Sequence, residues 1–184
     1  MSAARCAARV RCLGIASVLS MLVLAGCATS RSAFTLPEIA HAMLPVSDAA
    51  VAGRLAPGDI ERLRAAGIRS VIDLSVDDET PDFDEAGAVR AAGLYYTNLP
   101  LRGAAGLTRD HVREFDALVR TAARPLLLHC ASGNRVGAMA ALRAAWVDGK
   151  SVDDAIGIGK AWGLKGLESE VRRRIGAASG VAPE

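Results

Sequence analysis

The chain has 184 residues, with 22 basic and 20 acidic side chains and only 4% aromatic residues. A length of this order is typical of one domain with short additional segments. Nucleic-acid binding needs a basic surface or aromatic stacking platforms, so the balanced charge and the few aromatic residues exclude nucleic acid from the expected partners.

The first part of the chain has the pattern of a targeting segment. Three arginines are followed by an apolar run at residues 13–25 and by Leu-Ala-Gly-Cys at 24–27. The run is too short for a stable membrane span and is typical of a cleaved signal. The four-residue motif resembles the bacterial lipobox, which implies cleavage before Cys27 and lipidation of its thiol. We therefore expect a signal peptide at 1–26, a lipidated tether at 27–49, and anchoring to a bacterial envelope membrane, facing the periplasm or the exterior.

Cleavage at this point would change the charge and the cysteine inventory. Removing three of the 22 basic residues leaves 19 against 20 acidic ones. Of the four cysteines, Cys6 and Cys12 would leave with the signal, and lipidation would consume Cys27. Cys130 then stays unpaired, so no intramolecular disulfide is expected. A lone thiol in an oxidising compartment favours a functional role for Cys130.

After the tether, apolar segments alternate with helical patterns. A folded domain is predicted at 50–176 and a disordered tail at 177–184. Strands are predicted at 51–55, 68–74, 94–99 and 125–130, and helices at 38–43, 57–66, 82–92, 108–121, 136–147 and 166–175, with a short one from residue 151. Gly67 and Gly93 are predicted C-terminal caps, and Thr108 and Ser151 are predicted N-terminal caps. The alternation indicates an α/β fold, a three-layer sandwich with a mostly parallel central sheet and helices on both faces.

One strand end carries a pattern of reactive and small residues. The apolar run after Pro125 ends at His129 and Cys130, a short loop follows, and a helical pattern begins near Arg135. The loop residues are Ala131, Ser132, Gly133 and Asn134. Backbone N–H groups of such a loop converge, and the helix N-terminus adds partial positive charge, so both favour the thiolate of Cys130. Together with the guanidinium of Arg135, the pattern predicts a nucleophile inside an anion-binding loop.

His129, Cys130, Gly133 and Arg135 together resemble the signature loop of cysteine-dependent phosphatases of the tyrosine and dual-specificity type. The region 53–164 is similar to the phosphatase-like domain of beta-lactamase-hydrolase-like proteins. This resemblance implies a tyrosine-phosphatase-like fold and a phosphocysteine intermediate on Cys130, with Arg135 binding the phosphoryl oxygens. It also implies support of the loop by His129, a phosphorylated protein or a small anionic molecule as substrate, and no cofactor.

Two features of the loop leave other functions open. The phosphatases have five residues between the cysteine and the arginine, whereas this chain has four, which is the spacing of rhodanese-type sulfurtransferases. The phosphatases also usually have Ser or Thr where this chain has Val136. A sulfurtransferase that carries a persulfide on Cys130 and a non-catalytic anion-binding module therefore stand beside the phosphatase as alternatives. A buried structural cysteine is the remaining interpretation.

Phosphatase chemistry also needs a general acid that protonates the leaving oxygen. The resembled family carries an Asp on the loop before the third helix, but residues 100–107 contain no carboxylate, and Asp110 is better explained as a partner of the helix dipole. The acidic segment 77–82 follows a predicted strand and should lie at the same sheet edge as Cys130. Its candidate acids are Asp78, Glu79 and Asp82. The alternative is a solvated acidic loop without a catalytic role.

The spacing of the histidines does not indicate a metal site. The chain contains only His41, His111 and His129, which are far apart in sequence. Metal sites are recognised in sequence chiefly from closely spaced His and Cys residues. No metal ligands are therefore predicted.

Overall fold

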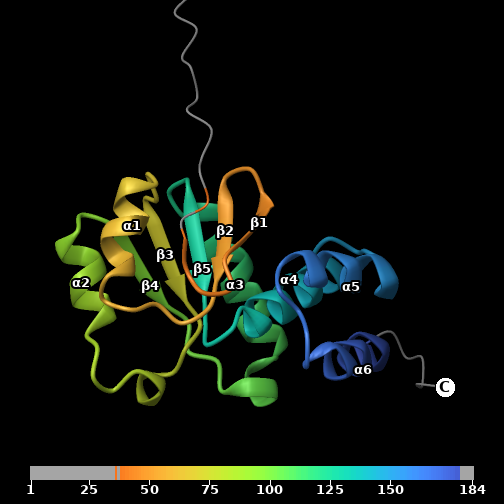
Figure 1. The fold of residues 1–184 in the computed structure, drawn as a ribbon. Coiled ribbons are helices and arrows are strands. Elements are labelled where there is room, and N and C mark those ends of the chain that lie inside the picture. Colours follow the sequence, from red (N-terminus) through yellow and green to blue (C-terminus); the bar gives the residue numbers. More distant parts are fainter. Residues whose placement is uncertain (1–35, 37, 179–184) are drawn as a thin grey trace, which may run out of the picture. The chain divides into compact units, whose positions relative to one another are not determined.

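The computed structural model describes residue 36 and residues 38–178, and Figure 1 shows their arrangement. The strands are β1 (Met43–Val46), β2 (Ala49–Ala52), β3 (Ser70–Asp73), β4 (Tyr95–Asn98) and β5 (Leu126–His129). The helices are α1 (Asp59–Ala65), α2 (Glu85–Ala91), α3 (Arg109–Thr121), α4 (Asn134–Trp146), α5 (Val152–Ala161) and α6 (Glu168–Ala178). Two 3₁₀ turns, η1 (Asp77–Glu79) and η2 (Gly103–Gly106), follow β3 and β4.

The strands form one five-stranded sheet in the order β1-β2-β5-β3-β4. The edge strand β1 pairs antiparallel with β2, and all other neighbours pair parallel, as the sequence predicted. The central strand β5 ends at His129, whose register partners are Ala52 of β2 and Asp73 of β3. Because these strands are parallel, the segments that follow them leave the sheet at one edge, where ligands bind in α/β folds.

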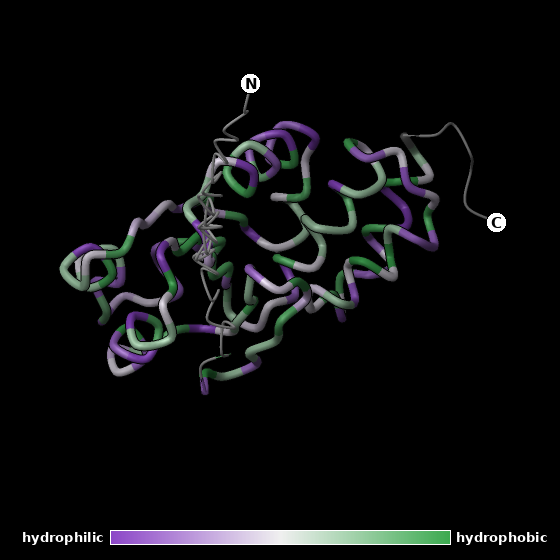
Figure 2. Tube along the Cα trace, turned by 90° about the horizontal axis from the view of Figure 1, so that it is seen from above, coloured by the Kyte–Doolittle hydropathy of each residue, from purple (hydrophilic) through white to green (hydrophobic). Residues whose placement is uncertain are grey.

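Helices cover both faces of the sheet, which confirms the predicted three-layer sandwich (Figure 1). Successive residues of a strand point to opposite faces. In β5, Leu127 packs with Leu63 of α1 and Val89 of α2, whereas Leu128 packs in the core that Phe115 of α3 shares with α4, α5 and α6. Figure 2 shows hydrophobic and hydrophilic residues following one another along the helices, the pattern of helices with one buried face.

The loop that follows Cys130 is positioned by the close packing of α4 against α5. A Cβ on Gly137 of α4 would lie 2.0 Å from the backbone nitrogen of Leu164, and a Cβ on Gly159 would lie 2.7 Å from the Cβ of Ala141. Only glycine fits at these two positions without moving a neighbour. The helix that begins directly after the loop is therefore held against α5 and the segment that follows it.

The folded part begins earlier than expected. A helix was predicted at 38–43 and a tether up to residue 49, but β1 starts at Met43 and β2 starts at Ala49. Both predictions are wrong at this boundary, because pairing with β2 decides the conformation of β1, which contains Pro45 and has little strand character of its own. The predicted signal peptide and the lipidation site Cys27 lie outside the described residues.

Other element boundaries differ by a few residues. The helix predicted from residue 82 begins at Glu85, because the side chain of Asp84 accepts a hydrogen bond from the N–H of Gly87 (2.9 Å) and caps it. The last helix continues to Ala178, into the predicted tail, and residues 179–184 lie outside the described part. Thr108 and Ser151 are N-caps as predicted. Over the described residues, no helix is both long and apolar enough to cross a bilayer.

Candidate active site

Cys130 directly follows β5 at the carboxyl edge of the sheet and is 1% exposed. Gly133 has a φ of +79° and precedes the first residue of α4. This left-handed conformation, which side chains disfavour, turns the chain from the strand into the helix. The predicted strand–loop–helix arrangement around Cys130 is thus present.

The loop between Cys130 and α4 is held from its far side by the segment after α5. The Oδ1 of Asn134 accepts a hydrogen bond from the N–H of Lys165 (2.8 Å). A Cβ on Gly163 would lie 3.0 Å from the carbonyl oxygen of Gly133, so the two backbones are in close contact. These contacts fix the curvature of the loop.

The loop has backbone hydrogen-bond donors that no other described residue uses. Within residues 38–178, the N–H groups of Ala131, Ser132 and Gly133 donate to no other residue. Unpaired N–H groups in a tight loop at a helix N-terminus form a concavity that favours anions. The predicted anion-binding loop therefore has the donors that such a role needs.

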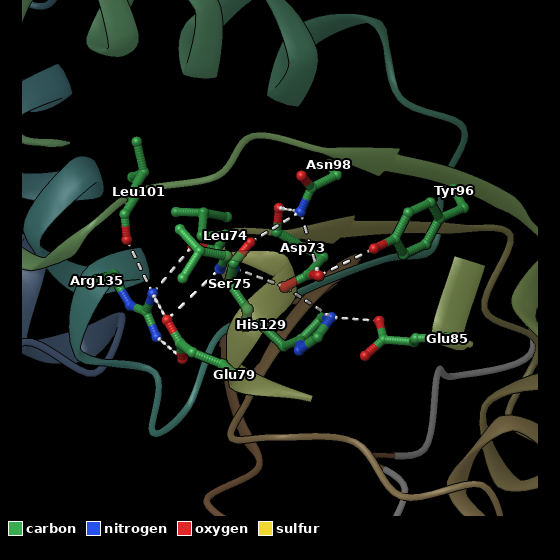
Figure 3. A network of polar contacts seen from close by, with 11 residues as sticks. Asp73, Leu74, Ser75, Glu79, Glu85, Tyr96, Asn98, Leu101, His129 and Arg135 are labelled. Carbon is green, nitrogen blue, oxygen red and sulfur yellow. Dashed lines mark hydrogen bonds and ion pairs between the residues drawn. The ribbon is translucent and has the colours of Figure 1, made fainter. Parts of the chain in front are cut away.

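Arg135 lies next to this loop and is 8% exposed. Its Nη1 bonds the Oε1 of Glu79 at 2.6 Å and its Nη2 bonds the Oε2 at 2.5 Å, which makes a two-point ion pair (Figure 3). Nη1 also donates to the carbonyl oxygens of Leu74 (3.2 Å) and Leu101 (2.9 Å). The guanidinium is thereby held between the segments that follow β3 and β4.

The ion pair shifts both pKa values. Burial alone would lower the pKa of Arg135, but the hydrogen bonds to Glu79 and the negative charges of Glu79 and Cys130 raise it above its ordinary value. The hydrogen bond from Arg135 lowers the pKa of Glu79, against a smaller opposite effect of its burial. Both oxygens of the Glu79 carboxylate are bound to Arg135, and its lowered pKa makes it a poor proton donor.

A cleft of about 350 Å³ lies beside the loop. Its lining comes from the loop, η1 and the segment after β4, and includes Asp78, Glu79, Arg102, Ser132 and Arg135. Asp78 forms an ion pair with Arg102 at 3.1 Å on the exposed rim. Asp82 is exposed and does not line the cleft. Of the three candidate acids, Asp78 is thus the one that borders the cleft without being tied to Arg135.

His129, predicted to support the loop, is 1% exposed and lies between two buried carboxylates. Its Nε2 is 2.7 Å from the Oε1 of Glu85 and 3.4 Å from the Oδ1 of Asp73 (Figure 3). The other oxygen of Asp73 accepts hydrogen bonds from the hydroxyl of Tyr96 (2.9 Å) and the amide of Asn98 (3.2 Å). Burial, followed by the charge and hydrogen bond of Asp73, raises the pKa of Tyr96.

This His129 cluster was not predicted from the sequence, where no group of metal-binding side chains was expected. One signal was present. Asp73 and His129 are the last residues of two mostly apolar strands, and these strands turn out to be neighbours. A polar residue at the end of a buried strand points to the functional edge of a parallel sheet.

The sequence and the fold of this chain resemble those of known proteins. The family model described as the phosphatase-like domain of beta-lactamase hydrolase-like proteins matches residues 43–147. A beta-lactamase hydrolase-like protein of Xylella fastidiosa is 30% identical over 111 residues, which are 58% of this chain and 25% of that protein. This chain therefore spans about a quarter of the length of the curated relative it matches.

Two solved structures resemble the fold. A candidate phosphatase of Neisseria meningitidis has a TM-score of 0.62 and 25% identity, covering 74% of this chain and 96% of that one. A candidate phosphatase of Shewanella putrefaciens has a TM-score of 0.59 and 19% identity, covering 77% of this chain and 94% of that one. The second likeness concerns the fold alone.

Proposed function

This chain belongs to the family of phosphatase-like domains of beta-lactamase hydrolase-like proteins, and from this premise we propose that it is a cysteine-dependent phosphatase of the tyrosine and dual-specificity type. One observation carries the proposal. Cys130 lies at the carboxyl end of the central strand, beside a loop of unpaired N–H groups and beside Arg135. The substrate class is a phosphate monoester on a protein or a small molecule.

The loop and Arg135 bind the oxygens of the phosphoryl group, and the Cys130 thiolate attacks phosphorus. The S–P bond forms as the P–O bond to the leaving group breaks, which gives a phosphocysteine. Water then attacks the phosphorus, the S–P bond breaks, and the thiolate returns with release of inorganic phosphate. The donors stabilise charge on the equatorial oxygens during both steps.

Arg135 is oriented for this role by its partners. The pairing of Nη1 and Nη2 with Glu79 uses one edge of the guanidinium. The other edge carries the Nε–H and the second hydrogen of Nη2. Among residues 38–178 it has no carboxylate or carbonyl acceptor, and the remaining hydrogen-bond partner of the guanidinium is the nucleophile Cys130. Two parallel N–H groups on one edge match two oxygens of a phosphate. Glu79 is therefore a positioning residue that presents this edge.

Asp78 is the proposed general acid. It borders the cleft, whereas the loop after β4, where the resembled phosphatases carry their acid, contributes Arg102 and Gly103 to the lining. Asp78 would give its proton to the leaving oxygen in the first step and take one from water in the second. Arg102, its ion-pair partner on the rim, is available to an anionic substrate.

The short loop supports a second candidate, sulfur transfer. Four residues separate Cys130 from Arg135, and Val136 provides no hydroxyl to help the thiolate leave phosphorus. In sulfur transfer, the thiolate attacks the outer sulfur of thiosulfate and sulfite leaves, which forms a persulfide. Cyanide then removes that sulfur as thiocyanate. A persulfide needs space for only one sulfur atom beside the loop.

One pair of assays separates the two reactions. Wild-type protein and the Cys130→Ser variant are incubated with an aryl phosphate, and separately with thiosulfate followed by cyanide. We expect release of phosphate by the wild type alone and no one-sulfur adduct in its intact mass. An adduct on the wild type without phosphate release would establish the sulfurtransferase instead. If the protein catalyses neither reaction, the non-catalytic anion-binding module is the interpretation that remains.

We also propose that the chain is attached to an envelope membrane by a lipid on Cys27. The support is the arginines, the apolar run and the lipobox-like motif at 24–27. Attachment would place the domain beside the membrane surface and restrict it to substrates of that compartment.

A further inference from the structure

Three buried side chains behind Cys130 bring a nitrogen and carboxylate oxygens to one point. His129 ends β5, Asp73 ends the neighbouring β3, and Glu85 is the first residue of α2. One ligand atom from each lies within 4.8 Å of the others. Asp73 and Glu85 are each 6% exposed and His129 is 1% exposed. Three separate segments thus converge on a site that is closed to solvent.

The hydrogen bonding of this cluster is incomplete. The Oε1 of Glu85 and both ring nitrogens of His129 are buried and have no hydrogen-bond partner, although the Nε2 and the Oε1 are only 2.7 Å apart. The distance between the Nε2 of His129 and the Oε1 of Glu85 permits an ion pair, but the angles at these two atoms do not suit a hydrogen bond. Buried polar atoms in this state are rare, and an ion is one of the explanations for them.

The charge of the cluster is also unbalanced. Among residues 38–178, no Lys or Arg forms an ion pair with Asp73 or Glu85. Two buried carboxylate groups side by side without a cationic side chain are costly. A divalent cation beside a neutral imidazole would neutralise both carboxylates.

The surroundings of Asp73 resemble those of a metal ligand. Its Oδ1 accepts a hydrogen bond from the N–H of Ser75 (2.7 Å), and its Oδ2 accepts from Tyr96 and Asn98. Outer hydrogen bonds of this kind fix the orientation of a ligating carboxylate, and they leave the second lone pair of Oδ1 free. The carboxylate is therefore held with one oxygen toward His129.

We propose that Asp73, Glu85 and His129 bind one divalent transition-metal ion. Imidazole nitrogen and carboxylate oxygen suit Zn²⁺ and Mn²⁺, and the general order of affinities favours Zn²⁺. The ion would tie the ends of β3 and β5 to the start of α2, directly before the nucleophile. Its role is structural, since the cluster is closed to solvent and the cleft is lined by other residues.

The test uses the full chain carrying Cys130→Ser, because that thiolate would compete for zinc and the substitution leaves the cluster intact. The chelator-treated protein is titrated with Zn²⁺ while thermal unfolding and bound metal are measured. Glu85→Gln removes a ligand, and Glu61→Gln is the matched control, since Glu61 is exposed and pairs only with Arg64 on α1. These readouts do not depend on catalysis, so their failure would leave the proposed phosphatase function untouched.

We expect one bound Zn²⁺ and a Tm that rises by roughly 5 to 10 °C at a large excess of Zn²⁺ over Kd. Glu85→Gln should lower the affinity at least about tenfold, and Glu61→Gln should leave it unchanged. No bound zinc, or equal binding by Glu85→Gln, would overturn the proposal.

If Glu85→Gln does not fold, a second measurement tests the proposed metal site. Co²⁺ is added to the Cys130→Ser parent, and its absorption spectrum reports the ligands. Weak visible bands without an intense sulfur-to-cobalt band support a nitrogen and oxygen site. An intense sulfur band, which would come from the cysteines near the N-terminus, or the absence of any band contradicts it.

Discussion

Glu79 and Arg135 are 56 positions apart in the sequence and form a two-point ion pair at 2.6 and 2.5 Å. The pair joins η1, which follows β3, to the first turn of α4. It therefore couples the acidic segment to the loop that contains Cys130, and the first two predictions depend on this coupling.

Removal of the carboxylate charge should affect both stability and activity. In Glu79→Gln, the partly buried guanidinium of Arg135 loses its anionic partner, so the free energy of unfolding should fall by about 1–3 kcal/mol. The other edge of Arg135 would no longer be aligned, so kcat/KM for an aryl phosphate should fall up to about 100-fold. Urea unfolding and steady-state kinetics measure the two effects. Asp77→Asn, in the same turn but exposed, is the control, and an equal loss there would contradict the role of the pair.

The same pair predicts how stability depends on pH. The pKa of Glu79 is lowered from its ordinary value of 4.5 by Arg135. Its contribution to stability is therefore complete above the ordinary value and is lost as the pH falls through the lower, folded-state value. The difference in free energy of unfolding between wild type and Glu79→Gln should be constant near neutral pH and shrink below about pH 5. A difference that persists unchanged in acid would show that the charge of Glu79 is not its source.

The loss of activity on replacing Asp78 should depend on the leaving group of the substrate. Asp78→Asn should reduce kcat/KM about 100-fold for alkyl phosphates, whose leaving oxygens need a proton, and less than about tenfold for activated aryl phosphates. Asp82→Asn is the matched control because Asp82 does not line the cleft. The two variants are compared on both substrate types. Equal losses on both substrates would remove Asp78 from proton transfer.

Gly163 should matter for activity through the loop it contacts. It has a φ of +95°, and a Cβ there would lie 3.0 Å from the carbonyl oxygen of Gly133. Gly149 also has a positive φ, of +66°, but nothing lies within 4 Å of its Cβ position. Each Gly→Ala change should cost about 1–2 kcal/mol of stability through the backbone conformation. Only Gly163→Ala should also lower phosphate hydrolysis, and similar activity of the two variants would refute the contact argument.

The lipid anchor is tested by location. Cys27→Ser removes the thiol that the lipobox-like motif marks for lipidation, so the variant should leave the membrane fraction or accumulate as an uncleaved precursor. Cell fractionation with immunodetection compares the variant with wild type. Identical partition of both proteins into the soluble fraction would refute the lipid anchor.

Features that depend on near neighbours in sequence could be predicted. Gly67 and Gly93 were predicted to end helices, and both have a φ of +80° directly after the C-cap residues of α1 and α2. The strand–loop–helix around Cys130 was recognised for the same reason, since an apolar run, a turn glycine and a helix start are local signals.

Features that depend on a neighbouring strand could be predicted only in part. The acidic segment was expected beside Cys130, because parallel strands end at one edge of a sheet. The expectation was right for Asp78 and Glu79, but the three candidate carboxylates could not be ranked as acids from the sequence. The short edge strand β1 was mistaken for helix and tether, because its pairing with β2 is the cause of its conformation.

The sequence by itself therefore determined the type and order of most elements, the position of Cys130 at a strand end, and the pool of acidic candidates. Only the tertiary structure decided that Glu79 pairs with Arg135, that Asp78 stays on the cleft, and that Asp73 and Glu85 close around His129. The physical reason is the range of the interactions. Helix caps and strand periodicity act over a few residues, whereas the order β5-β3 in the sheet sets which distant side chains meet at its edge.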